Sequence, residues 1–169
     1  MSGFTDARIL VIMGSKSDWP VMQGCTDRLK GFGIAYAVHV ASAHRTPEYV
    51  EELIAKAEAG KVELIIAAAG MAAHLAGAVA ARTILPVIGI PIDAAPLNGI
   101  DSLLSTVQMP PNMPVLTVGI GRAGAVNAAV AAAEILARGD TELRDRLLAD
   151  RQAMRERIFR DDQELPRDE

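Results

Sequence analysis

The sequence predicts an α/β fold built around a doubly wound, mainly parallel sheet, and two observations lead to this prediction. Short apolar runs rich in β-branched residues alternate with segments whose apolar residues recur every three or four positions. The composition is 50% hydrophobic but only 4% aromatic, so the core must consist of small aliphatic side chains that let helices lie close to a sheet. Strands separated by helices pair in parallel, because each helix returns the chain to the edge of the sheet where the strand began.

The first half of the chain shows this alternation. Residues 8–13 (RILVIM) predict a strand that stops at Gly14, and N-cap residues then lead into an amphipathic helix over 18–32 that Gly33 ends. The next expected elements are a strand at 34–40, a helix opened by Thr46 and Pro47 and running to about Ala59, and a fully apolar strand at 62–69.

The second half repeats the same unit. No internal repeat or linker indicates a second domain, so we interpret residues 1–169 as a single domain with a core at 8–139. The expected elements are a helix at 72–82, a strand at 86–90, a short helix at 100–107, a strand at 114–120 and an alanine-rich helix at 124–137.

A charged C-terminal helix is expected at about 141–161, because the composition changes sharply after Gly139. Its narrow apolar stripe requires a partner surface, which is either the same domain or another subunit; the sequence favours neither. Residues 161–169 (DDQELPRDE) are expected to be disordered. The stripe consists of Leu143, Leu147, Met154 and Ile158.

Composition also narrows the class of function. The formal net charge is −4 and the 17 basic residues are spread along the chain, which argues against a nucleic-acid partner. The N-terminal residues lack the apolar run of a signal peptide and no later run reaches the ~18 residues of a membrane span, so we expect a cytoplasmic protein without membrane contact. Cys25 has no His or carboxylate neighbours at metal-binding spacing, so we expect a buried core thiol and no metal site.

Ligands of open parallel sheets bind beyond the carboxyl ends of the strands, so the loops there are the candidate site. The first is GSKSD (14–18), where Gly14 permits a tight turn and the hydroxyls of Ser15 and Ser17 lie beside a helix N-terminus, as a phosphate site requires. Asp18 could accept hydrogen bonds from a ribose diol. The alternative is a plain helix cap made by Ser17 or Asp18.

The second loop, SAHRTP (42–47), places His44 beside Arg45. The forked donors of an arginine hold a phosphate, and a histidine titrates near neutral pH, as a group that gives and takes a proton in one cycle must. The alternative is that His44 only bonds the loop backbone.

The third loop, AAAGMAAHLAG (67–77), is rich in small residues that let the backbone approach a planar ligand. We expect His74 in the first turn of a helix, where the helix dipole disfavours an imidazolium. A neutral His74 would hydrogen-bond a substrate carboxylate or ring; the alternative is a packed histidine bonded to a neighbouring loop. His39, inside a strand, is interpreted as structural.

Together and in this order, the three loops resemble the aminoimidazole ribonucleotide carboxylase family, in particular its bacterial class I branch of N5-carboxyaminoimidazole ribonucleotide mutases. The HRT triplet at 44–46 favours that branch, because the carbon-dioxide-using relatives typically have Lys and Gly in place of Arg45 and Thr46. The resemblance covers roughly residues 8–137. Further blocks similar to the family are LPVIGIPI (85–92), DSLLSTVQMP (101–110) and PVLTVGIGRAGAVNAAVAAAEILA (114–137).

The resemblance implies a role for each loop. His44 corresponds to the catalytic histidine, and His74 to a supporting ligand. The residues expected to bind the substrate are Gly14, Ser15, Ser17, Asp18, Ser42, Ala43, Arg45, Ala69, Gly70, Met71, Ala73, His74 and Leu75, with Ala72 in the same loop.

The resemblance further implies a flavodoxin-like three-layer α/β/α sandwich with a C-terminal helical extension, assembled as a homo-octamer in which that helix reaches neighbouring subunits. The implied reaction moves a carboxylate from the exocyclic nitrogen of a small ribonucleotide to ring carbon C4 in de novo purine (IMP) biosynthesis. It is an isomerase reaction, and it uses no cofactor and no metal.

Three positions depart from the family pattern: Met71, Ala76 and Asn112 stand where many relatives have glycine, proline and glycine. None removes a group with acid–base or phosphate-binding ability, so we expect changes in substrate fit and retained activity. Two other functions stay open, a carboxylase that takes free carbon dioxide and a non-catalytic phosphosugar-binding module. A flavin-binding electron carrier fits poorly, because hydroxyl ligands and aromatic residues are scarce.

Overall fold

The computed structural model describes residue 4 and residues 6–94 and 96–166. Within this part, five strands form one parallel sheet in the order β2-β1-β3-β4-β5. This is the flavodoxin-like order, with its topological switch point between β1 and β3, and it confirms the predicted fold class. The strands are β1 (Ile9–Met13), β2 (Tyr36–Val40), β3 (Leu64–Gly70), β4 (Val87–Ile92) and β5 (Leu116–Thr117).

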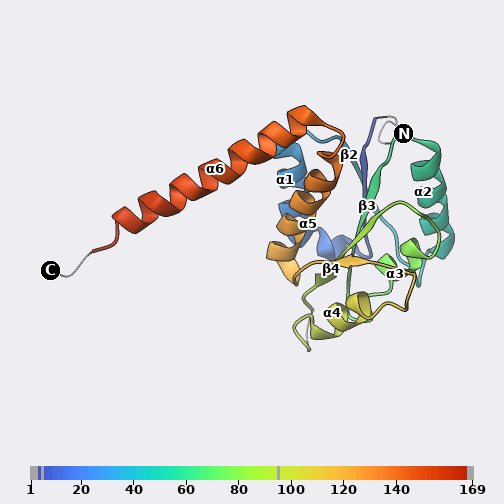
Figure 1. The fold of residues 1–169 in the computed structure, drawn as a ribbon. Helices are drawn as coiled ribbons and strands as arrows, with labels where there is room; N and C mark the ends of the chain where they lie inside the picture. Colours follow the sequence, from blue (N-terminus) through green and yellow to red (C-terminus); the bar gives the residue numbers. More distant parts are fainter. Residues whose placement is uncertain (1–3, 5, 95, 167–169) are drawn as a thin grey trace.

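Helices cover both faces of the sheet and complete the three layers (Figure 1). The α1 and α5 helices pack on one face, and α2 and α3 pack on the other. The helices are η1 (Lys16–Asp18), α1 (Trp19–Gly31), α2 (Pro47–Ala59), α3 (Leu75–Ala80), α4 (Ile100–Val107), α5 (Gly121–Leu136) and α6 (Thr141–Gln163).

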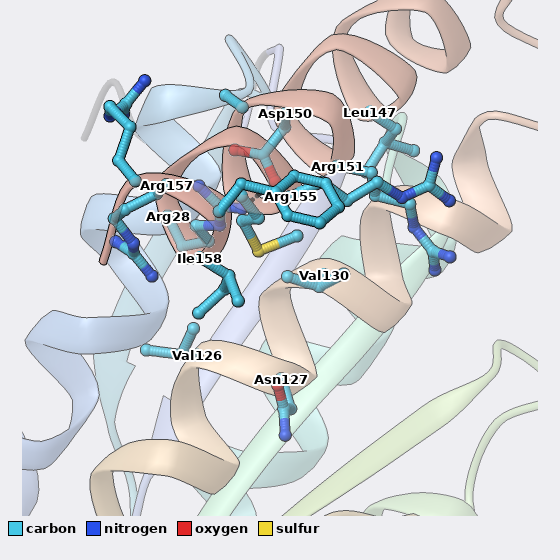
Figure 2. A pocket seen from close by; sticks show the side chains of 14 residues that line it. Arg28, Val126, Asn127, Val130, Leu147, Asp150, Arg151, Arg155, Arg157 and Ile158 are labelled. Atoms are coloured by element: carbon cyan, nitrogen blue, oxygen red, sulfur yellow. Dashed lines mark hydrogen bonds and ion pairs between the residues drawn. The ribbon is translucent and has the colours of Figure 1, made fainter. Parts of the chain in front are cut away.

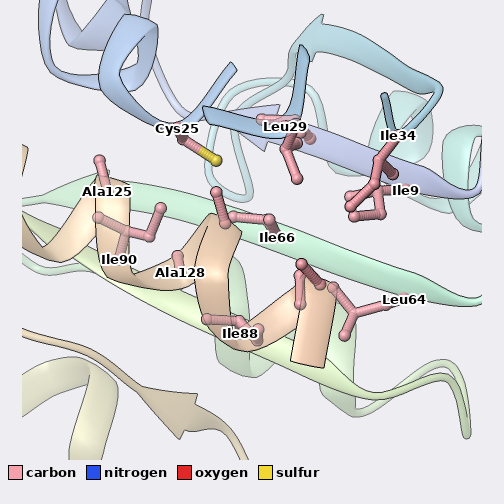
Figure 3. Close-up of a cluster of buried hydrophobic side chains, with 14 of the residues drawn as sticks. Ile9, Cys25, Leu29, Ile34, Leu64, Ile66, Ile88, Ile90, Ala125 and Ala128 are labelled. Carbon is pink, nitrogen blue, oxygen red and sulfur yellow. The ribbon is translucent and has the colours of Figure 1, made fainter. Parts of the chain in front are cut away.

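Burial on both faces explains why the strands are continuously apolar. In β1, Ile9 and Val11 belong to the cluster beneath α1 and α5, whereas Leu10 and Ile12 belong to the cluster beneath α2 and α3. Figure 3 shows the first cluster, where α5 lies close over β3 and β4. Small side chains make this approach possible, since the buried face of α5 includes Ala125, Ala128, Ala129, Ala132 and Ala133.

Cys25 belongs to the same cluster, which confirms the prediction of a buried thiol. Burial raises the pKa of its thiol to about 12, because the low-dielectric surroundings disfavour the thiolate. At neutral pH this thiol is therefore protonated and packs as a small apolar group.

The α3 helix begins at Leu75, later than the predicted start at 72. The cause is Met71, whose φ of 56° is left-handed and whose carbonyl oxygen accepts a hydrogen bond from the Ala73 N–H at 2.8 Å. A turn therefore replaces the first expected helical turn. The prediction that His74 lies in the first turn of the helix is wrong, because His74 occupies the N-cap position.

The last two strands also differ from the prediction. β4 continues to Ile92, beyond the expected end at 90, and β5 is only two residues long instead of 114–120. The chain leaves β5 early because it turns sharply into α5: a Cβ on Gly124 would lie only 1.6 Å from the carbonyl oxygen of Gly119. The paired length of the edge strand is thus set by this turn.

The α6 helix confirms the predicted C-terminal helix and runs two residues past its expected end, to Gln163. The expectation of disorder is therefore wrong for 161–163, since α6 continues through these residues and ends before Pro166, which cannot extend a helix. Residues 167–169, also part of that expectation, lie outside the described residues. None of the helices described is both long and apolar enough to cross a membrane.

Only the first turns of α6 pack on the rest of the protein. Leu143 and Leu147 join the α1/α5 cluster, and the Asp140 carboxylate caps the helix by accepting from the Leu143 N–H at 3.0 Å. Farther along, Met154 and Ile158 are exposed and the helix extends away from the sheet (Figure 1). The stripe is thus half docked within this chain and half open.

Candidate active site

The loops after four neighbouring strands line one cleft of about 700 Å³ at the carboxyl edge of the sheet. All three loops selected from the sequence meet there, as the strand-end rule requires. Its lining comprises Gly14, Ser15, Ser17, Asp18, Val21, Ser42, Ala43, His44, Arg45, Ala69, Gly70, Met71, Ala72, His74, Leu75, Ile92, Asp93 and Ala94.

The loop after β1 is organised by a capping box. Ser15 is the N-cap of η1: its hydroxyl accepts from the Ser17 N–H at 3.3 Å, and its own N–H donates to Asp18 Oδ2 at 3.0 Å. The two serine hydroxyls lie 2.8 Å apart and line the cleft. A helix cap is therefore present, but the expectation that Ser17 or Asp18 makes it is wrong: Ser15 is the N-cap, and Asp18 completes the capping box. The same cap leaves both serine hydroxyls on the cleft.

Asp18 lies beneath these hydroxyls and is only 8% exposed. Burial raises the pKa of its carboxyl above the ordinary value, and hydrogen bonds from Ser15 and Ser17 and the charge of Arg45 oppose that shift. The carboxylate is held in one orientation, with an edge on the cleft where ligand hydroxyls would reach it.

Arg45 joins the first two loops. Its Nη2 donates to the carbonyl oxygen of Gly14 at 3.0 Å and its Nε to Ser42 Oγ at 3.4 Å. The Ser42 N–H donates to Thr46 Oγ1 at 2.9 Å, so the loop also closes on itself. The guanidinium is exposed and positioned, and its remaining N–H donors are available to an anion.

His44 and His74 meet across the cleft. Their rings contact edge to face, with centroids 5.4 Å apart, and both side chains are exposed. Across the described chain, no hydrogen bond of the His44 ring is found that would hold it to the loop backbone. His44 is thus exposed on the cleft lining, within reach of a ligand bound there.

Not every residue selected from the sequence faces the cleft. Ala73 is 2% exposed and does not line the cleft, so its predicted contact with the substrate stays a prediction. His39 lies on β2, where its Nδ1 is 3.1 Å from the Tyr49 hydroxyl and its ring packs near Phe4. Burial lowers the pKa of His39, and the charge of Lys56 adds to this. These contacts support the structural role expected for His39.

Sequence reasoning missed the fourth wall of the cleft. Ile92, Asp93 and Ala94 follow β4, and Val21 adds one residue from α1. The available signal was the strand-end rule itself, but β4 was predicted to stop at 90. The carboxylate of Asp93 lies against the N-terminus of α5: a Cβ on Gly121 would come 3.0 Å from its Oδ1.

A larger cavity, of about 990 Å³, lies elsewhere, between α6 and the α1 and α5 helices (Figure 2). Val126, Val130 and Ile158 line it together with several arginines, among them Arg28, which pairs with Asp150. No strand ends there and it holds no histidine. The smaller cleft, which gathers the residues predicted to bind a phosphate and to transfer a proton, is the candidate site.

Similarity to known proteins covers nearly the whole chain. Residues 8–157 match the family described as AIR carboxylase. The N5-carboxyaminoimidazole ribonucleotide mutase of Escherichia coli (strain K12) is 47% identical over 153 residues, which cover 90% of each protein. The protein of that name from Pseudomonas aeruginosa is 54% identical over 130 residues, 77% of this chain and 80% of the relative. The crystal structure of Treponema denticola PurE superposes with a TM-score of 0.86 at 31% identity, covering 94% of this chain and 98% of that one.

Proposed function

The chain belongs to the AIR carboxylase family, and from this premise we propose that it converts N5-carboxyaminoimidazole ribonucleotide to 4-carboxy-5-aminoimidazole ribonucleotide in purine biosynthesis. The observation that carries the proposal is the meeting of His44, Arg45 and the hydroxyl-bearing loop after β1 in one cleft. This reaction needs three kinds of protein group at one place: groups that bind the phosphate of the substrate, groups that bind its ribose, and an acid–base residue.

The phosphate and ribose are held by the first two loops. The Ser15 and Ser17 hydroxyls, the Ser42 hydroxyl and the free donors of Arg45 converge on the phosphate. Arg45 is already fixed by Gly14 and Ser42, so little side-chain entropy is lost on binding. The buried carboxylate of Asp18 accepts hydrogen bonds from the ribose diol.

His44 moves the proton. It protonates the carbamate nitrogen as the N–C bond breaks and the bonding electrons return to that nitrogen, which releases carbon dioxide. Ring carbon C4 then attacks the carbon dioxide, and His44 removes the C4 proton. The same residue acts as acid and then as base, so it needs no co-reactant and must lack a permanent partner.

The third loop forms the seat of the imidazole ring. Gly70 lies so close to β4 that a Cβ there would be 3.4 Å from the Ile92 carbonyl oxygen, and Ala69 and Ala72 keep the wall shallow. His74, in contact with His44, bonds the carboxylate or the ring as a supporting ligand.

The active form is a homo-oligomer, by the family resemblance an octamer, and the outer half of α6 is one of its contacts. Support comes from the exposed apolar side chains of that half: Ile158 and Phe159 are 61% and 67% exposed, and both line the cavity beneath α6. Neighbouring exposed apolar side chains of this kind often mark a protein–protein contact.

The test is a product assay with the carbamate ribonucleotide, run with and without added bicarbonate. The mutase gives the C4-carboxylated product in both conditions. Product that depends on bicarbonate would instead identify a carboxylase that takes free carbon dioxide. Ribonucleotide binding with no product in either condition would identify a non-catalytic binding module and overturn the proposal.

A further inference from the structure

Met71 is an unusual residue for its backbone position. Its φ of 56° is left-handed, a region in which the Cβ of a side chain lies too close to the following carbonyl oxygen. The other described non-glycine residues with positive φ are Asn98 and Asn112, and asparagine tolerates this conformation through local hydrogen bonds. Methionine has no such compensation, so the position carries a cost that a glycine would avoid.

The side chain of Met71 also stands out in the cleft. It is 60% exposed, whereas Leu75 and Ile92 in the same lining are almost fully buried and Val21 is partly buried. Its neighbours Gly70 and Ala72 are small, so the side chain has room to move. With three rotatable bonds and a polarisable sulfur, methionine adapts its shape to a ligand better than other apolar residues.

We propose that Met71 is a flexible apolar cover that retains carbon dioxide beside the imidazole ring between its release and its capture. The inference rests on the proposed function, in which carbon dioxide is free between the breaking of the N–C bond and the forming of the C4–C bond. Carbon dioxide has no charge and offers no hydrogen-bond donor, so polar groups of the cleft hold it weakly. A movable apolar side chain confines it by excluding water and blocking its exit.

The test measures what fraction of the released carbon dioxide is captured by C4 and what fraction escapes from the cleft. Purified parent protein and Met71→Gly are given the carbamate ribonucleotide in buffer containing carbon-13 bicarbonate, with the uncatalysed breakdown of the substrate subtracted. Two quantities are followed: free aminoimidazole ribonucleotide released per product formed, and carbon-13 in the product. We expect both to rise several-fold in Met71→Gly, because carbon dioxide escapes and is replaced from solution.

Asn112→Gly is the matched control. It also places a glycine at a left-handed position, but Asn112 lies outside the cleft, so relief of backbone strain alone should leave both quantities unchanged. Met71→Leu keeps an apolar side chain and should restore most of the retention. A merely structural role for Met71 would change stability without changing the division of the intermediate.

The outcomes separate this inference from the proposed function. If the parent forms product and Met71→Gly releases no more aminoimidazole ribonucleotide and takes up no more carbon-13 than the parent, the cover is disproved while the function stands. Equal leakage from Asn112→Gly and Met71→Gly would also disprove it. If the parent forms no product, the proposed function fails and the inference fails with it. Should Met71→Gly not fold, Met71→Ala serves for the same comparison.

Discussion

The guanidinium of Arg45 donates a hydrogen bond to the carbonyl oxygen of Gly14 at 3.0 Å, across 31 residues of sequence. This bond ties the loop after β2 to the loop after β1, and it fixes the place where a phosphate would be held. In the proposed function the phosphate-binding donors are therefore in place before any ligand arrives, which reduces the ordering that binding requires.

Arg45→Lys should weaken substrate binding and leave the fold intact. Lysine keeps the charge but cannot bond Gly14, Ser42 and a phosphate together, so a loss on the order of 1.5–3 kcal/mol is expected from charged hydrogen bonds. KM should rise by tenfold or more on that scale, and the unfolding midpoint should change little. The control is Arg146→Lys, which should leave KM unchanged because Arg146 pairs with Glu142 on the exposed surface of α6. Equal KM values for parent and Arg45→Lys would remove Arg45 from the phosphate site.

Asp18→Asn should raise stability at neutral pH and reduce affinity for the ribonucleotide. The folded-state pKa of Asp18 is raised, so its contribution to stability is fully present below its ordinary value of 3.8 and is lost as pH rises through the folded value. At pH values above the folded-state pKa of Asp18, the asparagine variant avoids the cost of a buried charge. Urea titrations across acidic and neutral pH should show the parent losing stability relative to Asp18→Asn as pH increases. The opposite trend would mean that the hydrogen bonds from Ser15 and Ser17 lower the pKa of Asp18 by more than burial raises it.

Gly121→Ala should destabilise the protein through the backbone at the start of α5. Gly121 has a φ of 70°, and a Cβ there would lie 3.0 Å from Asp93 Oδ1. The left-handed conformation alone costs an alanine roughly 1–2 kcal/mol, measurable as a lower free energy of unfolding. Gly139→Ala, where a Cβ meets no atom within 4 Å, is the matched control. If both variants unfold at the same urea concentration as the parent, the strain at Gly121 is absent.

Charges placed on the open half of α6 should disrupt assembly. Met154→Glu together with Ile158→Glu should lower the mass measured by sedimentation and leave the helix content unchanged, because neither side chain is buried within this chain. The control is Ala149→Glu, at an exposed position on the other side of the same helix, and its sedimentation mass should equal that of the parent. A parent protein that sediments as a monomer would refute the oligomer, and a double variant with parental mass would refute this contact.

The parts predicted well from the sequence are those that a single physical rule determines. The apolar runs around Val11 and Ile66, short and rich in β-branched residues, predicted buried strands, and the strand-end rule then placed His44 and Arg45 at one edge of the sheet. The apolar stripe on α6 was also evident from the sequence, but the sequence did not show that one half of it is buried and the other half exposed. Whether Met154 has a partner depends on surfaces that one chain does not contain.

The parts missed depend on contacts between segments far apart in sequence. Asp93 was overlooked because β4 was expected to end at 90, and its extension to Ile92 follows from pairing with β3. The left-handed Met71 gave no local signal, since methionine has no preference for that conformation. The start of α3, and with it the position of His74, shifted for this reason.

The most direct test of the account is a comparison of binding and turnover in His44→Asn. Asparagine fits the loop and leaves Arg45 and Ser42, the proposed phosphate ligands, in place, but it cannot carry a proton. We expect the variant to bind the carbamate ribonucleotide with nearly parental affinity by calorimetry and to form no C4-carboxylated product above the uncatalysed background. Near-normal turnover by His44→Asn would contradict the account, because the proton would then be moved by another group.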